Sequence, residues 1–508
     1  MGLFELMGKK LVKFFTGYSE YFLAEPVLTQ EKALGEIMSR NKDTLFGKKH
    51  GFDDVKTARD FQKRCDVHSY DYFKPYIDAF LEGNKKAFCS DKLLYFAQTS
   101  GTTGTPKLIP VTSKLLTYYT LGFVRVAAYY IALDPVRNSG ILNGKWLYLP
   151  APPVLRYKSG VPVGYITGLL FLPYGSQFWR KFLNIKSYAP LHLMHLKDVE
   201  MKFRKIYEDC AKKNITALTG VTPVVVNLLE YMLKFSGAKQ VKEIFPNLQF
   251  AIFSGVSPKF YKARLRQLVG RDIAIREEYA ASEGMIGVQL SDRSQFTPMY
   301  DKVFFEFVPV NDPGDRVLIN QIKKGKEYKV IITTYSGLYG YDIGDVVEFV
   351  SIDPPEFIFS FRKNVIDLAD EKLTPPQVLA AIERVNANHG SRMTDFCLIG
   401  TYDPKPHYIL AIEFAPGSKE PNKHQFLLDL DKALETENDI YYHNRNGSNK
   451  GTLSPPELWI LKKDTFISLE KQKGLEGAPI GQAKSTHVTK DAKLRDFFKD
   501  FSKDKISM

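Results

Sequence analysis

The sequence predicts a large N-terminal α/β domain followed by a smaller α+β domain. The chain has 508 residues, which is enough for more than one hydrophobic core. Short apolar runs alternate with helical patterns along most of the chain, as in α/β domains with largely parallel sheets. The alternation stops near residues 357–363 ("FIFSFRK"), where we place the change of domain.

The first domain, residues 1–361, is expected to begin with helices and then to alternate strands with helices. Apolar residues recur at helical spacing through residues 4–15 and 34–45. Short apolar runs predict strands at residues 93–96, 146–149, 215–218, 250–253, 273–275 and 330–333. The patterns between them predict helices at residues 114–133, 199–212, 223–235 and 259–269.

The second domain, residues 362–508, is expected to be a compact module with a hinge near Arg362. The patterns predict helices at residues 375–388 and 424–436 and strands at residues 396–399, 408–414 and 458–462, followed by a lysine-rich tail. This order of elements indicates an α+β arrangement.

The composition excludes several classes of protein. The four cysteines are widely spaced and include no Cys-x-x-Cys pair, so we expect a reducing, cytoplasmic setting without disulfides or zinc. The uncharged run at residues 159–179 could cross a bilayer by length, but its prolines and glycines would leave backbone groups unpaired in lipid. We therefore expect no stable membrane insertion. The net charge of +13 comes with scattered lysines, which favours an anionic small ligand over nucleic acid.

A hydroxyl-rich loop, "TSGTTGTPK", follows the first expected strand and ends at Lys107. Backbone N–H groups of such a loop can cradle phosphate oxygens, and the lysine adds a cation. The residues that we expect to contact phosphate are Thr99, Ser100, Gly101, Thr102, Thr103 and Gly104. The spacing differs from that of the Walker loop, and a polar surface turn is the alternative. Ser113 is the expected N-cap of the next helix.

Two later segments add residue types that suit a nucleotide. In "IREEYAASEGMIGV" the carboxylate of Glu283 lies in a turn of small residues, where it can bind Mg²⁺ beside phosphates. Tyr279 in the same segment offers a flat face for a base. In "TTYSGLYGYDIGDVVEF" the turn Gly344-Asp345 holds a carboxylate that can accept hydrogen bonds from both ribose hydroxyls.

The ordered set Thr-Ser-Gly-Thr-Thr-Gly-x-Pro-Lys, Tyr-x-x-Ser-Glu and Tyr-x-x-Gly-Asp resembles the acyl-adenylate-forming superfamily of acyl-CoA synthetases, peptide-synthetase adenylation domains and luciferases. Between the first two motifs, "GVTPVVVNLLEY" resembles the superfamily's Gly-Val-Pro helix start, and "FAIFSGVSP" resembles its adenine-pocket turn. The resemblance covers most of residues 93–365. It implies a fold of adenylate-forming type, ATP as a substrate, a small domain that rotates between two half-reactions, and nucleotide contacts from Ser254, Gly255, Tyr279 and Ser282.

Within the superfamily, "GLYGYDIGDVV" resembles the Gly-Leu-Tyr-Arg-Tyr-x-x-Gly-Asp-Val-Val pattern of the auxin-responsive Gretchen Hagen family. Members of that family are acyl acid amido synthetases, which join a carboxylic acid to an amino acid through an acyl-adenylate. Tyr339, Tyr341, Gly344 and Asp345 match the pattern, whereas Gly340 stands where the family has Arg. This departure concerns the acyl substrate rather than the nucleotide.

The hinge region bears on the acceptor of the acyl group. Acyl-CoA synthetases carry Gly-Arg-x-Asp-x-x-Ile-Lys-x-x-Gly there. Arg362 can take the ribose-contacting role of that Arg, while Asp367 and Asp370 stand close to where the Lys and the last Gly would lie. Carboxylates suit a narrow thioester tunnel poorly, which weighs against CoA as the acceptor. Near the C-terminus, "APIGQAKSTHV" resembles the family's Gln-x-Lys segment and implies Lys484 as the catalytic lysine, with a surface lysine as the alternative.

Arg125 lies in an apolar and aromatic helical stretch, where a buried cation needs an anionic partner. A structural salt bridge and a clamp on the carboxylate of the acid substrate both meet this need. His192 and His195 are three residues apart, but without a nearby carboxylate or cysteine they suit packing better than metal binding.

The sequence thus predicts an ATP- and Mg²⁺-dependent ligase that activates a carboxylic acid as an acyl-adenylate and conjugates it to an amino acid. Lys107, Glu283 and Lys484 are the expected catalytic residues, and Arg125 is the expected contact of the acid. A thioester-forming acyl-CoA synthetase and a nucleotide-binding relative without catalysis are the alternatives. The expected partners are small acids and amino acids, and no oligomeric state is predicted.

Overall fold

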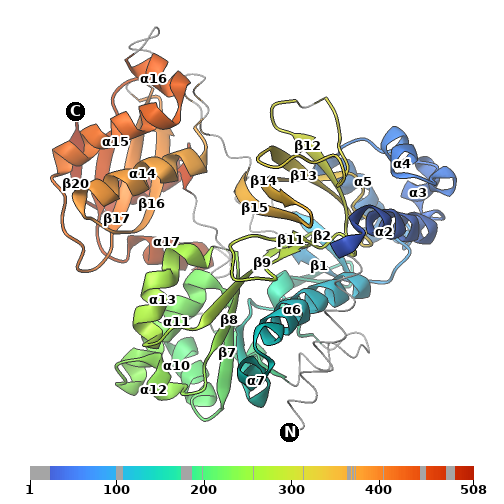
Figure 1. The fold of residues 1–508 in the computed structure, drawn as a ribbon, viewed down its shortest axis with the longest axis horizontal. Helices are drawn as coiled ribbons and strands as arrows, with labels where there is room; N and C mark the ends of the chain where they lie inside the picture. Colours follow the sequence, from blue (N-terminus) through green and yellow to red (C-terminus); the bar gives the residue numbers. More distant parts are fainter. Residues whose placement is uncertain are drawn as a thin grey trace. The chain divides into compact units, whose positions relative to one another are not determined.

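The computed structural model describes residues 23–98, 107–172, 186–196, 198–255, 257–312, 314–362, 366, 368, 371, 373–403, 406–446, 453–475 and 487–508. The chain divides into two compact units, and within the described residues the first runs up to Phe359 and the second starts at Ser360 (Figure 1). The helix expected at residues 4–15 lies outside the described residues. Among the helices that are described, none is both long and apolar enough to cross a membrane.

Short helices open the first unit and pack around aromatic side chains. They are α2 (Pro26–Asn41), α3 (Leu45–Lys49), η1 (Phe52–Asp54), α4 (Ala58–Arg64) and α5 (Tyr70–Leu81). Pro26 occupies the first turn of α2, and Thr57 and Asp60 form a capping box at the start of α4. The ring of Phe46 lies 4.6 Å from that of Tyr339. The helices therefore support the segment that carries the third sequence motif.

A seven-stranded sheet forms the centre of the first unit, with the strand order β11-β10-β9-β8-β7-β3-β6. The strands are β3 (Lys145–Leu149), β6 (Ser187–Tyr188), β7 (Ile215–Val221), β8 (Phe250–Ser254), β9 (Ala274–Ala281), β10 (Gly284–Val288) and β11 (Thr297–Pro298). The five strands from β6 to β9 pair in parallel, and β10 and β11 continue the sheet in antiparallel fashion. The strand–helix alternation of the sequence predicts such a parallel sheet.

Helices cover both faces of this sheet (Figure 1). On one face, Phe250 packs in a core with α6 (Ser113–Leu133), and on the other face its neighbour Ala251 packs in a core with α10 (Val199–Cys210), α11 (Thr222–Ser236) and α13 (Lys262–Val269). The other helices in the described part of the unit are α7 (Pro135–Asn138), η2 (Ser139–Asn143), α8 (Ile166–Leu169), η3 (Leu191–Leu193), α12 (Val241–Ile244) and η4 (Pro258–Tyr261). The helix expected at residues 259–269 is thus divided into η4 and α13.

Two smaller sheets in the first unit are mainly antiparallel, with β1 and β5 as a parallel pair, which corrects the expectation of largely parallel sheets. One has the order β2-β1-β5-β4, and the other has the order β12-β13-β14-β15. Their strands are β1 (Leu93–Gln98), β2 (Leu108–Thr112), β4 (Arg156–Lys158), β5 (Val161–Gly164), β12 (Phe304–Pro309), β13 (Glu327–Thr333), β14 (Tyr341–Ile352) and β15 (Pro355–Arg362). Consecutive strands in them are joined without an intervening helix, and such connections produce antiparallel pairs.

The second unit is a five-stranded sheet of order β19-β16-β17-β18-β20 with helices on both faces. Its strands are β16 (Met393–Thr401), β17 (His407–Phe414), β18 (Glu457–Leu461), β19 (Val488–Thr489) and β20 (Ser502–Ser507). The helices α14 (Pro375–His389), α15 (Lys423–Glu437) and α16 (Asp439–Arg445) share one core with the sheet, and α17 (Thr465–Leu475) and α18 (Ala492–Asp500) share the other. The helices and central strands expected from the sequence are present, and β19, β20 and the last three helices add to them.

Candidate functional site

The hydroxyl-rich loop joins two paired strands, β1 and β2. Gln98 and Leu108 are register partners in this antiparallel pair, so the two ends of the loop lie side by side. The loop residues from Thr99 to Gly104 lie outside the described residues. Lys107, directly before β2, is described and half-buried.

Lys107 and Glu283 meet at the hydroxyl group of Tyr341. The Nζ atom of Lys107 donates to this hydroxyl across 3.3 Å, and the hydroxyl donates to Oε1 of Glu283 across 3.2 Å. Tyr341 is fully buried at the first position of β14. One residue from each of the three sequence motifs therefore takes part in a single hydrogen-bonded chain.

The position of Glu283 follows from a tight β-turn. Ser282 and Glu283 connect β9 to β10, and the flanking residues Ala281 and Gly284 are register partners. The Glu283 side chain is 3% exposed, whereas Ser282 is half-buried. The turn holds a carboxylate at the end of the parallel part of the sheet, where open α/β sheets bind ligands.

Tyr279 and Asp345 form a second link between motifs. The Tyr279 hydroxyl donates to Oδ2 of Asp345 across 2.5 Å, and the Asp345 side chain is 1% exposed. Gly344 has a φ of +78° and lies inside β14 at an irregular step in the register, so the expected turn is a bulge within a strand. The Gly344 N–H donates to Oδ1 of Asp342 across 2.8 Å, which fixes the bulge.

The expected adenine-pocket turn follows β8 and contacts β9. Ser254 ends β8, and Gly255 adopts a φ of +80°. Next along the chain, the Ser257 hydroxyl donates to Oε2 of Glu277 across 3.0 Å. Burial raises the pKa of the Glu277 carboxyl to about 7, and this hydrogen bond opposes the rise.

Sequence reasoning missed Tyr341, Tyr70 and Glu277 as site residues. Lys107 Nζ lies 5.7 Å from the centre of the Tyr70 ring and 5.8 Å from that of Tyr341. Glu277 precedes Tyr279 by two residues, and alternation in a strand places both on the same face of β9. That alternation was the available signal for Glu277, whereas the contacts of Tyr70 and Tyr341 depend on tertiary structure.

Gly340, where the resembled family has Arg, is confined by its surroundings. Its φ is +57°, and a Cβ atom built there would lie 2.5 Å from the carbonyl oxygen of Asp66. The Gly340 carbonyl accepts from the His68 N–H across 2.8 Å, which holds the two segments together. An arginine side chain therefore does not fit this backbone.

Arg125 is buried and paired inside the protein, which argues against the expected contact with the acid substrate. Its Nη2 atom lies 2.8 Å from Oδ2 of Asp301, and the two side chains are 1% and 2% exposed. The Arg125 and Lys302 charges hold the pKa of the Asp301 carboxyl well below its usual range, against the effect of burial. This geometry favours the structural salt bridge.

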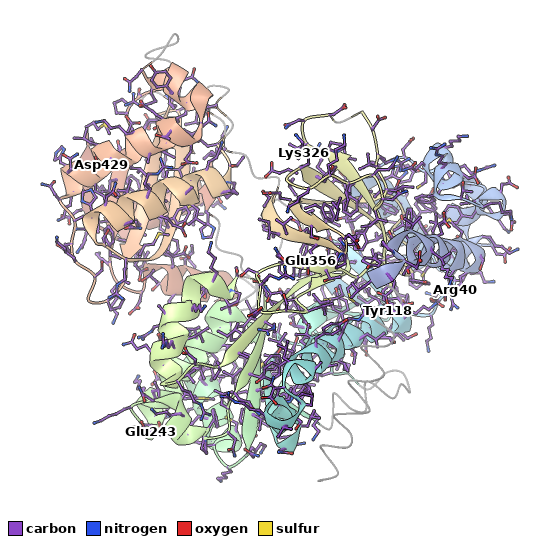
Figure 2. The ribbon with its side chains drawn as sticks, in the orientation of Figure 1. Arg40, Tyr118, Glu243, Lys326, Glu356 and Asp429 are labelled. Carbon is purple, nitrogen blue, oxygen red and sulfur yellow. The ribbon has the colours of Figure 1, made fainter. Side chains whose placement is uncertain are left out.

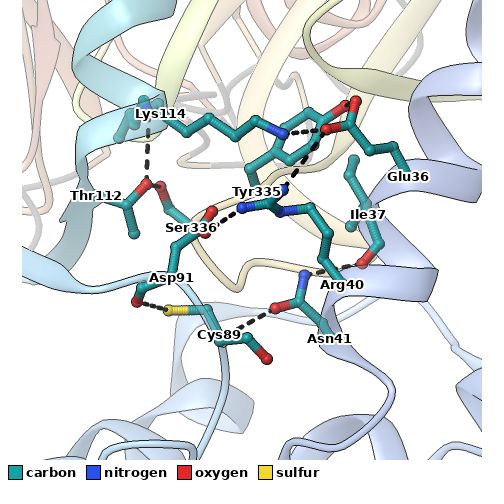
Figure 3. Close-up of polar contacts among 12 residues, drawn as sticks. Glu36, Ile37, Arg40, Asn41, Cys89, Asp91, Thr112, Lys114, Tyr335 and Ser336 are labelled. Atoms are coloured by element: carbon teal, nitrogen blue, oxygen red, sulfur yellow. Dashed lines mark hydrogen bonds and ion pairs between the residues drawn. The ribbon is translucent and has the colours of Figure 1, made fainter.

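A polar cluster joins α2, the start of α6 and the segment after β13 (Figure 3). Glu36 accepts hydrogen bonds from Lys114 and from the hydroxyl of Tyr335. The Tyr335 ring packs edge-on against Tyr118, which is labelled on α6 in Figure 2. Thr112, rather than the expected Ser113, caps α6. Its hydroxyl lies 3.1 Å from that of Ser336, so the cluster ties the third motif to the strand after the hydroxyl-rich loop.

The expected site residues of the second unit are only partly described. The Arg362 side chain, Asp367, Asp370 and Lys484 lie outside the described residues. After Lys484, the chain is described again from His487, whose Nε2 lies 3.0 Å from Oδ1 of Asp395. β19 then pairs in parallel with β16, which anchors the chain that follows the candidate lysine.

Comparison with known proteins gives the same family along the chain. Residues 18–200, 296–362 and 376–493 match the GH3 family N-terminal, central and C-terminal domains. A probable indole-3-acetic acid-amido synthetase of Arabidopsis thaliana, GH3.1, is 25% identical over 90% of this chain and 88% of its own length. The indole-3-acetic acid-amido synthetase GH3.8 of Oryza sativa subsp. indica is 26% identical, with 90% and 87% covered.

Solved structures show the same fold. The acyl acid amido synthetase AtGH3.15 in complex with 2,4-DB superposes with a TM-score of 0.83 at 18% identity and covers 97% of both chains. A 2-hydroxyisobutyryl-CoA ligase in the postadenylation state has a TM-score of 0.61 at 11% identity, with 94% of this chain and 92% of the ligase covered. These likenesses confirm the adenylate-forming fold that the motifs implied. The chain belongs to the GH3 family, whose three domain models match most of its length.

Proposed function

We propose that this protein activates a carboxylic acid with ATP as an acyl-adenylate and then transfers the acyl group to an amino acid. The observation that supports this most directly is the hydrogen-bonded chain from Lys107 through Tyr341 to Glu283. It brings a cation and a carboxylate from separate motifs to one place beside the hydroxyl-rich loop. The named relatives, which are amido synthetases, support the choice of reaction.

Each motif contributes a different part of the nucleotide site. The loop from Thr99 to Gly104 cradles the β- and γ-phosphates, and Lys107 neutralises their charge. Glu283 is a single buried carboxylate, which suits Mg²⁺ that is bound mainly by phosphates and water. Asp345 accepts from the ribose hydroxyls, and Tyr279, which donates to Asp345, lies beside the base. Ser254 and Gly255 in the adenine-pocket turn, and Ser282 in the turn before Glu283, provide further contacts to the nucleotide.

Glu277 extends this site toward the base. Its carboxylate lies on the Tyr279 face of β9 and accepts from Ser257 in the adenine turn. A carboxylate in this position accepts a hydrogen bond from the exocyclic amino group of adenine. Guanine presents a carbonyl oxygen at the same place, so Glu277 favours ATP over GTP.

The chemistry divides into two steps. The carboxylate of the acid attacks the α-phosphorus of ATP, pyrophosphate leaves, and a mixed anhydride forms. The amine of the amino acid then attacks the acyl carbon, AMP leaves, and the amine loses a proton to solvent. Lys484 stabilises the charge of the first step, Arg362 contacts the ribose, and the second unit rotates about the hinge between the steps.

The acceptor is an amine rather than CoA. Counted from Arg362, Asp367 and Asp370 place two carboxylates within one residue of the positions where a thioester-forming relative keeps a lysine and a glycine. They repel the phosphates of CoA, whereas a small amino acid needs no such passage. All four cysteines are free and buried thiols, which suits a cytoplasmic enzyme.

A pyrophosphate-release screen tests both steps. Carboxylic acids are incubated with ATP and Mg²⁺, first alone and then with each amino acid or with CoA, and the products are identified by mass spectrometry. We expect pyrophosphate release with some acids and acyl–amino acid conjugates as products. If pyrophosphate is released and acyl-CoA forms without any amide, the proposed amine acceptor is contradicted. If none of the acids gives pyrophosphate release, the proposed function is contradicted.

A further inference from the structure

Glu278 is a buried carboxylate that the proposed reaction does not use. Its side chain is 2% exposed, and neither of its oxygens has a hydrogen-bond partner within the described part of the chain. Burial alone raises the pKa of the Glu278 carboxyl well above its ordinary value. Burying a carboxyl group without a hydrogen-bond donor costs folding stability, and an apolar residue at this strand position would avoid that cost.

The register of the sheet shows which way Glu278 points. Glu278 is the partner of Ser254 in β8 and of Val288 in β10. Paired residues share a face, and Val288 belongs to the core that contains α6. Glu278 therefore points toward α6, on the face opposite to Glu277 and Tyr279.

Aromatic side chains surround this position. Tyr119 on α6 and Tyr148 on β3 belong to the core on this face, and Glu278 contributes, after burial, to the raised pKa values of both phenols. The Tyr148 ring lies 4.6 Å from that of Phe171 and 5.8 Å from that of Phe123. This face accordingly offers flat apolar surfaces around one acidic group.

The same region adjoins the candidate site. The Tyr119 hydroxyl donates to the carbonyl of Ala281, which precedes the Ser282–Glu283 turn. Burial raises the pKa of the Tyr119 phenol, and Glu283 and Glu278 add to this rise. Thr219 of β7 is a register partner of Tyr148, and its buried hydroxyl also has no hydrogen-bond partner among the described residues. Two unsatisfied polar groups thus lie near the carboxyl ends of parallel strands on one face.

We propose that Glu278 is a specificity-determining residue, which accepts a hydrogen bond from a donor on the ring of an aromatic acid substrate. The donor is a hydroxyl, an amino group or a ring N–H at the end of the acid remote from its carboxylate. The proposal rests on the proposed function, since it assigns the substrate class of that same site. An acid without the donor leaves the carboxylate unsatisfied and is disfavoured.

Matched pairs of acids test this inference. The probes are 4-hydroxyphenylacetic acid against 4-methylphenylacetic acid, and indole-3-acetic acid against 1-benzothiophene-3-acetic acid. Each is measured with the full-length wild type, Glu278→Gln and Glu278→Leu, both by pyrophosphate exchange and by calorimetric titration. Ser187→Ala, which removes a buried hydroxyl from the outermost strand of the same sheet, is the control.

The wild type should prefer a donor-bearing acid over its partner by roughly 10- to 100-fold, which corresponds to the cost of leaving one buried polar group without a hydrogen bond. Glu278→Leu should abolish the preference, Glu278→Gln should reduce it, and Ser187→Ala should leave it unchanged. If no donor-bearing acid binds more tightly than its partner, or if the preference survives in Glu278→Gln and Glu278→Leu, the inference is overturned. Absence of exchange with every acid would instead count against the proposed function.

Discussion

The hydroxyl of Tyr341 donates to Glu283 across 3.2 Å and at the same time accepts from Lys107. Glu283 lies 58 positions before Tyr341 in the chain, and Lys107 lies 234 positions before Tyr341. One phenol thus orients a cation and a carboxylate that both face the proposed phosphates. Its ring is fully buried, so the position of the hydroxyl is fixed by packing.

Replacing Tyr341 by Phe should lower kcat by about tenfold and raise the Mg²⁺ concentration needed for half-maximal rate, because Glu283 loses its donor. Steady-state pyrophosphate release at several Mg²⁺ concentrations measures both effects. The matched control is Tyr339→Phe, since the Tyr339 hydroxyl donates to the Phe88 carbonyl across 2.6 Å, outside the candidate site. Equal kinetics for the two variants would contradict the role of Tyr341.

Lys107→Ala should raise the KM for ATP by at least tenfold while the fold stays intact, because one phosphate-facing charge is lost. Circular dichroism checks the fold. Lys49→Ala is a suitable control, since Lys49 also lies over two tyrosine rings, at 5.5 and 5.6 Å, but in the N-terminal helices. Unchanged ATP kinetics in folded Lys107→Ala would reject the phosphate contact.

Asp345→Ala should weaken ATP binding by about 1.5–3 kcal/mol, the contribution of a hydrogen bond to a charged group. Calorimetric titration with ATP measures the loss. Tyr279→Phe should have a smaller effect, because it leaves the carboxylate in place and removes only its donor. Asp272→Asn changes an exposed ion pair and should bind ATP as the wild type does. Wild-type affinity in Asp345→Ala would remove this residue from the site.

Gly340→Ala should destabilise the protein more than Gly344→Ala. Both glycines have positive φ, which costs a side chain roughly 1–3 kcal/mol. Only at Gly340 does a Cβ atom also meet backbone, at 2.5 Å from the Asp66 oxygen, whereas nothing lies within 4 Å of a Cβ at Gly344. Urea unfolding of the two variants tests this difference. Equal stability would show that the Asp66 segment yields, and that the arginine of the family could be accommodated.

Glu277→Gln should change how stability depends on pH. The pKa of Glu277 rises from 4.5 to about 7 on folding, so between these values the folded protein keeps a proton that the unfolded chain has lost. The contribution of this proton to the free energy of unfolding is fully present below pH 4.5 and is lost as the pH rises to about 7. The free energy of unfolding falls by at most about 1.4 kcal/mol per pH unit in this range. Relative to wild type, the variant should therefore gain stability over this range. Parallel pH profiles would contradict the shifted pKa.

Much of this protein could be predicted from the sequence. The alternation of apolar runs and helical patterns predicted the central strands and their helices, because periodicity depends on local geometry. The motifs indicated the family and the adenylate-forming fold, which the comparisons confirm. They also placed Glu283 in a turn after a strand, where the structure has it.

Other features were decided only by the tertiary structure. From the sequence, Arg125 could form either a structural salt bridge or a contact with the acid substrate, and the ion pair with Asp301 favours the salt bridge. Tyr341 became the link between Lys107 and Glu283 because strands from distant parts of the chain converge there. Glu278 looks like its neighbour Glu277 in sequence, but the register with β8 and β10 turns it toward α6. Periodicity assigns residues to alternate faces of a strand, whereas what each face meets depends on contacts between segments far apart in the chain.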